Sequence, residues 1–218
     1  MKHKAWSRAL SLAMSALMLV SLLCVPALAD DAAPGEGAVT IWAGLQAALS
    51  AGGNVTLGGN ITASADDQAL IVPADKAVTL DLSGRTIDRA LTGGVYQGYV
   101  IRVEGALTVQ DSSAEQTGRI TGGYNDPSNA DSAGGGVYVD LNGELILNGG
   151  TISGNRAYSG AGVYLCGAAA VTVSGAAIRG NESASDGGGI YVSSGCTLRL
   201  QSGSIQQNKA GGDGAGVF

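Results

Sequence analysis

A short pattern recurs four times at nearly constant spacing in the second half of the chain. The segments GGGVYV, GAGVYL, GGGIYV and GAGVF begin at residues 134, 160, 187 and 214, which lie 26, 27 and 27 residues apart. A triplet with apolar first and third residues (LIL, VTV and LRL) follows the first three starts after 11 positions, an isoleucine after 18 and an asparagine after 21. A fixed period of this length indicates a solenoid in which each repeat forms one coil.

Each repeat contains three short β-segments separated by turns. Alternation places Val137 and Val139 on one face of a strand, and Leu145 and Leu147 behave likewise. Strands this short bury their apolar face only when coil stacks on coil. The sequence therefore predicts an all-β protein, a parallel β-helix with three short strands per coil of about 26–27 residues, right-handed by the crossover rule.

Looser coils precede the regular ones. One comprises LIV (70–72), VTLDL (78–82) and Ile87, and the next comprises IRV (101–103), LTV (107–109) and Ile120. VTLGGNIT (55–62) is expected to open the stack, and residues 124–133 to form a loop insertion at a turn. The β-helix is thus predicted over residues 54–218. Because the chain stops at Phe218 within a strand of a new coil, we expect a truncated C-terminal end.

Residues 30–53 are predicted to contain a linker and an N-terminal capping helix. Helical spacing places five apolar side chains on one face, namely Ile41, Trp42, Leu45, Ala48 and Leu49. Thr40 is the expected N-cap and Gly52 the expected stop. A helix here would cover the open edge of the first coil, because an exposed β edge promotes aggregation.

Residues 1–29 have the features of a secretory signal peptide. Lys2, Lys4 and Arg8 precede the apolar stretch 9–25, and Ala27-Leu28-Ala29 matches a cleavage site. The alternative, an uncleaved membrane anchor, fits the length of residues 9–28. Either way the chain is expected to be exported, so we predict that it is secreted or lies on the cell surface.

Export would leave an acidic chain without histidine. Cleavage after Ala29 leaves nine basic and 18 acidic residues, a net charge of −9, which argues against nucleic acid or anionic lipid as a partner. His3 is the only histidine, so mechanisms that need a histidine base are disfavoured. Cys166 and Cys196 would meet an oxidising compartment, and both a disulfide and two free thiols are open alternatives.

Two sets of residues at equivalent repeat positions, asparagines and aromatic residues, are candidate functional or structural residues. The asparagines are expected to form a ladder of hydrogen bonds, with Asn125 as a further candidate member: Asn155, Asn181 and Asn208. The aromatic residues at equivalent positions are expected to point outward as a stripe that either binds sugar rings or only packs across strands: Tyr138, Tyr164 and Tyr191, followed by Phe218.

Acidic and basic candidates are fewer. Asp186 and Asp213 occupy the same repeat position and could bind calcium, act as an acid/base pair, or be solvated loop residues. Beyond calcium at this pair, no cofactor is expected. Arg102 and Arg199 are expected to project outward, but the sequence predicts no convergent cluster of arginine and carboxylate side chains. Asp126, Asp131 and Asp140 lie near the long loop and carry less weight.

The repeat resembles a known bacterial group. Gly-Gly-Gly-Ile and Gly-Ala-Gly-Val alternate with Ile-Ser-Gly-Asn, Ile-Arg-Gly-Asn and Ile-Gln-Gln-Asn, which is similar to the polymorphic outer-membrane-protein repeat, although isoleucine replaces its usual phenylalanine. More broadly, VTLDLSGRTI (78–87) and TGRITGG (117–123) resemble the first coils of secreted surface proteins of the pectin-lyase-like β-helix class. The resemblance covers about residues 40–218.

Two functional hypotheses follow from the resemblance and the composition. The first is an adhesin-like surface scaffold without catalysis, whose partners are polysaccharides or a host or neighbouring cell surface. It would contact the membrane only through the signal segment or a missing C-terminal anchor. The alternative is a polysaccharide lyase or glycoside hydrolase, since the resemblance to pectin-lyase-like proteins implies such substrates, although a fold alone does not confer activity.

Overall fold

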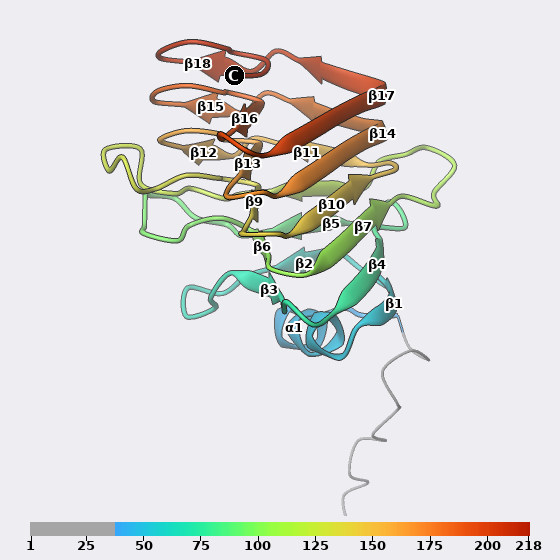
Figure 1. The fold of residues 1–218 in the computed structure, drawn as a ribbon. Coiled ribbons are helices and arrows are strands. Elements are labelled where there is room, and N and C mark those ends of the chain that lie inside the picture. Colours follow the sequence, from blue (N-terminus) through green and yellow to red (C-terminus); the bar gives the residue numbers. More distant parts are fainter. Residues whose placement is uncertain (1–37) are drawn as a thin grey trace, which may run out of the picture. The chain divides into compact units, whose positions relative to one another are not determined.

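The structure, a computed structural model, describes residues 38–218. The predicted signal segment, residues 1–29, lies outside this range. Residues 38–218 form a parallel β-solenoid of about six turns with one short helix at the end where the described residues begin (Figure 1). The predicted β-helix and its capping helix are confirmed.

Three parallel sheets build the solenoid. A ten-stranded sheet turns a corner inside its two longest strands and so supplies two walls. The first wall holds β1 (Gly53–Thr56), β4 (Ala77–Asp81), β7 (Ala106–Gln110), β10 (Glu144–Leu147) and the first halves of β14 (Ala170–Arg179) and β17 (Thr197–Gln206). The second wall holds β2 (Ile61–Thr62), β5 (Thr86–Asp88), β8 (Arg119–Thr121), β11 (Thr151–Ser153) and the second halves of β14 and β17.

Of the other two sheets, one runs along most coils and one is confined to the last three coils. The third wall is a five-stranded sheet of β3 (Leu70–Val72), β6 (Ile101–Val103), β9 (Val137–Val139), β13 (Val163–Leu165) and β16 (Ile190–Val192). The third sheet consists of three two-residue strands, which follow the second wall in each of the last three coils: β12 (Arg156–Ala157), β15 (Glu182–Ser183) and β18 (Lys209–Ala210). The predicted loop 124–133 contains no named strand.

Residues at equivalent repeat positions are strand partners in successive coils, as the repeat predicts. Ile120, Ile152, Ile178 and Ile205 are consecutive partners along the second wall. Val137, Val139, Leu145 and Leu147 are fully buried, which confirms the period-two pattern. Burying one such side chain contributes about 1.5–3 kcal/mol, so a column of them over several coils specifies the register.

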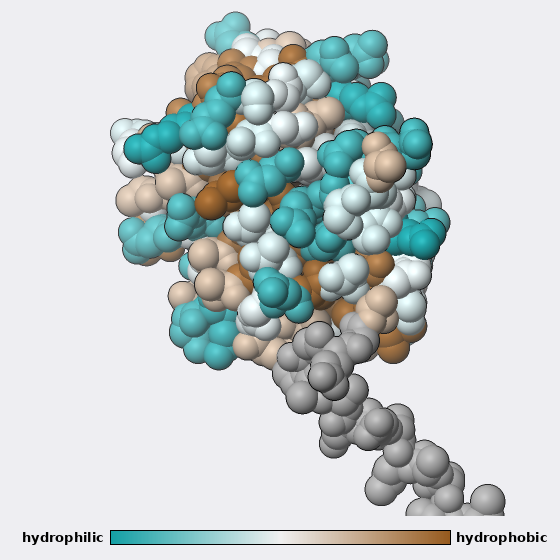
Figure 2. Space-filling view, turned by 90° about the vertical axis from the view of Figure 1, so that its right-hand side faces the viewer, coloured by the Kyte–Doolittle hydropathy of each residue, from teal (hydrophilic) through white to brown (hydrophobic). Residues whose placement is uncertain are grey.

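The outward side of the first wall is mixed in character. Thr79, Thr108 and Thr172 share one outward column, which Ile146 interrupts. Figure 2 shows the side of the molecule that lies at the right of Figure 1, near the labels of β4, β7 and β14. Hydrophilic, neutral and hydrophobic residues are interspersed on this side. Within residues 38–218, no helix has the length and apolar character needed to cross a membrane.

The helix α1 (Trp42–Ala51) differs from the prediction at its start. Ile41 is the N-cap residue in place of Thr40, without a side-chain capping bond, and it is 63% exposed. Its expected place on the buried face was therefore wrong, because the chain is still extended at Ile41. Trp42, Leu45 and Leu49 are buried as predicted. Gly52 ends the helix with a φ of 86°, a left-handed conformation that favours glycine.

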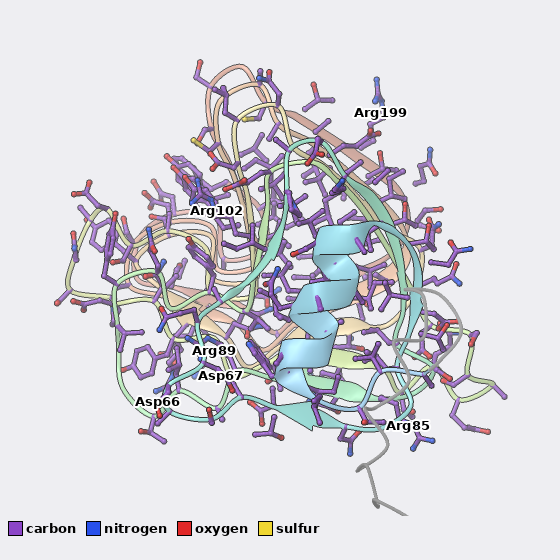
Figure 3. All side chains as sticks on the ribbon, turned by 90° about the horizontal axis from the view of Figure 1, so that it is seen from below. Asp66, Asp67, Arg85, Arg89, Arg102 and Arg199 are labelled. Carbon is purple, nitrogen blue, oxygen red and sulfur yellow. The ribbon has the colours of Figure 1, made fainter. Side chains whose placement is uncertain are left out.

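Gln46 explains how the helix covers the open edge. Its Nε2 donates to the carbonyl oxygen of Ile71 at 3.0 Å, and its Oε1 accepts from the N–H of Ile71 at 2.8 Å. One side chain thereby satisfies the backbone groups that the edge strand β3 would present to another chain. Nearby, Trp42 lies 5.6 Å below the guanidinium carbon of Arg89, which is labelled beside α1 in Figure 3.

Candidate functional site

A stack of five aromatic rings runs along the third wall. The ring centroids of Tyr99 and Tyr138 and of Tyr138 and Tyr164 are 5.5 Å apart, and those of Tyr164, Tyr191 and Phe218 follow at 5.0 Å. The interplanar angles lie between 13° and 27°, so the rings are stacked face over face. We call this set the aromatic ladder. It contains the three tyrosines predicted as a stripe.

The stacking changes what the stripe can do chemically. Each inner ring has a neighbour on both faces, so a sugar ring cannot also lie on these faces. The ring edges and hydroxyl groups remain as the groups for binding. Burial raises the pKa of the Tyr138 hydroxyl, reinforced by the Cys166 thiol, and burial also raises the pKa of Tyr164. These hydroxyls stay protonated and can both donate and accept.

Tyr99 was not predicted as a member of the ladder. The register pairs Arg102, not Tyr99, with Tyr138. The Arg102 side chain instead hydrogen-bonds to Asp140, and the ring of Tyr99, three residues earlier, lies over Tyr138. Tyr99 is outside the repeat pattern, so periodicity gave no signal for it.

The asparagine ladder is confirmed. Asn155 Nδ2 donates to Asn181 Oδ1 at 3.0 Å, and Asn181 Nδ2 donates to Asn208 Oδ1 at 3.0 Å. Asn155 and Asn181 are fully buried. Asn125 does not belong to the ladder: Asn155 Oδ1 accepts from the N–H of Gly123, which therefore occupies the equivalent position one coil earlier.

A cluster of Arg102, Glu104 and Asp140 lies beside the aromatic ladder. Arg102 Nε is 2.9 Å from Asp140 Oδ2 and 3.3 Å from Glu104 Oε1, and Arg102 Nη2 also bonds to Asp140. The expectation of no convergent arginine–carboxylate cluster was wrong, because a sequence separation of 38 residues corresponds to adjacent coils here. Arg199 projects from the first wall and lies apart from Arg102 (Figure 3).

Arg102 and Asp140 stabilise each other's charged form. Burial opposes ionisation of both groups, but their mutual hydrogen bond and attraction outweigh it. The pKa of Arg102 is raised and that of Asp140 is lowered. Arg102 therefore remains a cation and Asp140 an anion near neutral pH, so the pair is suited to binding and poorly suited to proton transfer.

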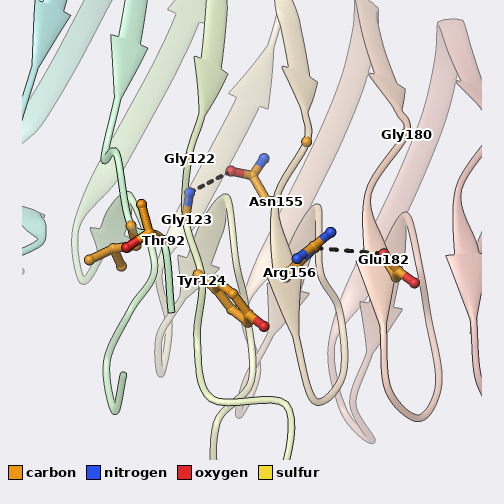
Figure 4. A pocket seen from close by; sticks show the side chains of 10 residues that line it. Thr92, Gly122, Gly123, Tyr124, Asn155, Arg156, Gly180 and Glu182 are labelled. Atoms are coloured by element: carbon orange, nitrogen blue, oxygen red, sulfur yellow. Dashed lines mark hydrogen bonds and ion pairs between the residues drawn. The ribbon is translucent and has the colours of Figure 1, made fainter. Parts of the chain in front are cut away.

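Among the hollows on the surface of residues 38–218, one adjoins the aromatic ladder and another adjoins Asn155 of the asparagine ladder. A cleft of about 160 Å³ lies next to the Arg102 cluster and includes Tyr96, Tyr99 and Tyr138 in its walls. A larger groove of about 400 Å³ runs past Asn155 across several coils (Figure 4). In it, Arg156 Nε is 3.6 Å from Glu182 Oε2, and the Arg156 guanidinium lies 5.3 Å from the ring centre of Tyr124.

The groove follows from glycines at stacked turns and is not a built binding or catalytic site. Gly122, Gly154 and Gly180 line it, all with φ between 63° and 77°, where a side chain is disfavoured. Missing side chains at three stacked turns leave the hollow. The side chains of Arg156 and Glu182 are 55% and 53% exposed, and ion pairs of such exposure contribute only about 0–1 kcal/mol.

Asp186 and Asp213 lie one coil apart, as predicted. Asp186 Oδ1 accepts from the backbone N–H of Asp213 at 2.7 Å, and Asp186 Oδ2 accepts from Ser185 Oγ at 3.1 Å. Their role as a calcium site stays a prediction. Across residues 38–218, no group of three or more histidine, cysteine, aspartate or glutamate side chains is arranged to hold a metal ion.

Cys166 and Cys196 are free thiols, and both are half-buried. The disulfide alternative is therefore not realised in this structure. Both thiols lie close enough to the Tyr164 hydroxyl to raise its pKa slightly, in addition to burial. They border the aromatic ladder from the turns that follow β13 and β16.

Asp111 is a structural residue that the sequence analysis missed. It is 5% exposed, and its carboxylate accepts from the N–H groups of Gly84, Ser113 and Gly118 and from Ser113 Oγ. Asp81 makes similar bonds to Ser83 and Ser112. An aspartate followed two residues later by serine is a turn signal that could have identified both.

Comparisons with known proteins identify no relative. The chain matches no protein-family model, and no curated protein or solved structure shows significant similarity to it. The fold is thus established as a parallel β-solenoid, and the resemblance to a particular repeat family stays a prediction.

Proposed function

We propose that this protein is an exported, adhesin-like β-helical scaffold that binds glycans without acting on them. The observation that carries the proposal is the aromatic ladder, which lines up tyrosine hydroxyls on one wall over successive coils. A row of rigid hydroxyls at the strand spacing of about 4.8 Å suits an extended, hydroxyl-rich polymer. Tyrosine is suited to such contacts because it combines an apolar body with a polar edge.

Export and placement at the cell surface rest on the sequence. The positive start, apolar stretch and Ala-Leu-Ala site of residues 1–29 support secretion. The resemblance of the Gly-Gly-Gly-Ile and Ile-x-x-Asn segments to polymorphic outer-membrane-protein repeats supports an adhesin-like role on a bacterial surface. The acidic mature chain favours uncharged partners over nucleic acid.

A substitution that spares the stacking tests the glycan part of the proposal. Replacing Tyr138, Tyr164 and Tyr191 together by phenylalanine keeps the rings and removes three hydroxyl groups. We expect retention of the variant on a glycan array to weaken while the protein stays folded under the assay conditions, which its urea unfolding curve checks. Equal retention by the triple variant would contradict binding through the ladder. Surface labelling of intact producing cells tests the placement independently.

The second candidate is a polysaccharide lyase or glycoside hydrolase, and the Arg102–Glu104–Asp140 cluster is the observation in its favour. A lyase base must release its proton, whereas Asp140 raises the pKa of Arg102 against the effect of burial. We therefore expect no new reducing ends and no unsaturated sugar products from a panel of polysaccharides. Product formation that disappears in Asp140→Asn would favour the enzyme.

A further inference from the structure

The cleft beside the N-terminal end of the aromatic ladder has the construction of a binding site. It measures about 160 Å³ and lies between the turn 95–98, the loop 125–133 and the outward sides of β6 and β9. We propose that this cleft binds one uncharged hexose unit of a glycan. The proposal rests on the glycan-binding function proposed above and gives it a specific subsite and ligand class.

The walls of the cleft are fixed by a buried asparagine. Asn125 is 2% exposed; its Oδ1 accepts from the N–H of Gly98 at 3.2 Å, and its Nδ2 donates to the carbonyl oxygen of Ala133 at 2.7 Å. One amide therefore ties both flanking loops together. A Cβ at Gly98 would lie 2.2 Å from the Tyr124 carbonyl oxygen, so the turn packs directly on the backbone. The cleft is pre-formed, which lowers the cost of ordering on binding.

Tyr96 supplies what the ladder lacks, an aromatic ring with open surface. It is 66% exposed, whereas Tyr99 on the other side of the cleft is 6% exposed and stacked on Tyr138. A large ring left in water at the rim of a cleft can cover the apolar face of a sugar ring. The ladder continues from the same cleft, so a longer glycan could extend along the tyrosine hydroxyls.

Polar side chains also line the cleft. Gln97 and Asp131 line the cleft, and neither side chain hydrogen-bonds to any other residue among 38–218. The guanidinium of Arg102 is held in place by Asp140 on the same side. The side chains of Gln97 and Asp131 therefore offer donors and acceptors that the hydroxyl groups of a sugar can use.

Charge and size narrow the ligand class. Among the residues that line the cleft, Arg102 contributes one positive charge, and Asp131 and Asp140 contribute two negative charges. This surplus repels carboxylated and sulfated sugars. A volume of about 160 Å³ is below the roughly 300–1,000 Å³ typical of sites for drug-sized ligands, so the cleft admits a single sugar unit.

The test uses the purified full-length protein on an array that contains neutral and acidic glycans, followed by calorimetric titration with the best neutral oligosaccharide. We expect Tyr96→Ala to weaken binding about tenfold, while Tyr96→Phe stays within about threefold because the ring is kept. Thr172→Ala is the control, since Thr172 lies in the outward column of the first wall, outside the cleft. The urea unfolding midpoint of each variant is measured alongside, so that a loss of binding is separated from a loss of stability.

Each outcome decides between the subsite and the broader proposal. A loss of glycan binding in Tyr96→Ala, with binding kept in Thr172→Ala, supports the cleft as the binding site. Unchanged binding in Tyr96→Ala overturns the cleft and leaves the ladder as the binding surface. Wild-type binding confined to acidic glycans overturns the neutral ligand class. Absence of any glycan binding overturns both this inference and the glycan part of the proposed function, and the surface-scaffold part then depends on the cell-labelling experiment.

Discussion

Asn181 Oδ1 accepts two hydrogen bonds from Asn155, one from its backbone N–H at 3.1 Å and one from its side-chain amide at 3.0 Å. Asn181 also donates to the carbonyl oxygen of Ile152 at 3.1 Å. A single buried side chain thereby satisfies backbone groups at a turn where strand pairing is interrupted. The asparagine ladder holds the corners of successive coils together.

Removing one member of this ladder should destabilise the protein strongly. Asn181→Ala leaves the N–H of Asn155 and the carbonyl of Ile152 buried without these partners, and each such group costs about 1–3 kcal/mol. We expect a loss of about 3 kcal/mol in the free energy of unfolding, measured by urea denaturation. Asn148→Ala, at an exposed site, is the control and should change stability by less than about 0.5 kcal/mol. A loss of similar size in both variants would contradict the role of the ladder.

The stacked rings of the aromatic ladder should stabilise the folded protein. Tyr164→Ala removes contacts with Tyr138 and Tyr191 and should cost about 2–4 kcal/mol. Tyr164→Phe loses only the hydroxyl that accepts from Ser193 Oγ at 3.2 Å, so we expect about 0.5–1.5 kcal/mol. Thermal unfolding of both variants checks the difference. Equal losses would show that the hydroxyl, and not the stacked ring, carries the stabilisation.

Asp111 should make stability depend on acid pH. Burial opposes its ionisation, but the hydrogen bonds from Ser113, Gly118 and Gly84 outweigh it and hold the pKa of Asp111 below its usual value. The unfolded chain therefore binds this proton at higher pH than the folded chain. Its contribution is present above the unfolded pKa of about 3.9 and is lost as pH falls through the lower folded pKa.

The variant Asp111→Asn should be less stable at pH 7 and should lose part of this acid dependence. Urea midpoints measured between pH 7 and pH 3 should converge between wild type and variant as the pH falls. Glu115→Gln, an exposed carboxyl in the same loop, is the control and should run parallel to wild type. A constant gap between Asp111→Asn and wild type over the whole range would contradict the prediction.

The regular part of the repeat could be predicted from the sequence because period and register coincide there. The isoleucine column and Asn155, Asn181 and Asn208 follow from spacing alone. Tyr99 and the contact of Arg102 with Asp140 could not be predicted, because they lie where coil length varies and the alignment of positions is lost. In those coils, which side chain occupies a column depends on loop contacts such as those of Asn125.

The third glycine of each triplet should be more sensitive than the glycines of the groove, because it makes room for the asparagine ladder. A Cβ at Gly162 would lie 2.4 Å from the carbonyl oxygen of Gly189 and 3.0 Å from Asn181 Nδ2. A Cβ at Gly180 would meet nothing within 4 Å, although its φ of 63° is unfavourable for alanine. Gly180→Ala should therefore cost only the left-handed strain of about 1–2 kcal/mol. Gly162→Ala must push two coils apart and should cost at least about 3 kcal/mol, the upper end of overpacking penalties. Urea denaturation of the two variants side by side checks this order, and a larger loss in Gly180→Ala would mean that backbone strain, and not the spacing between coils, explains the triplet.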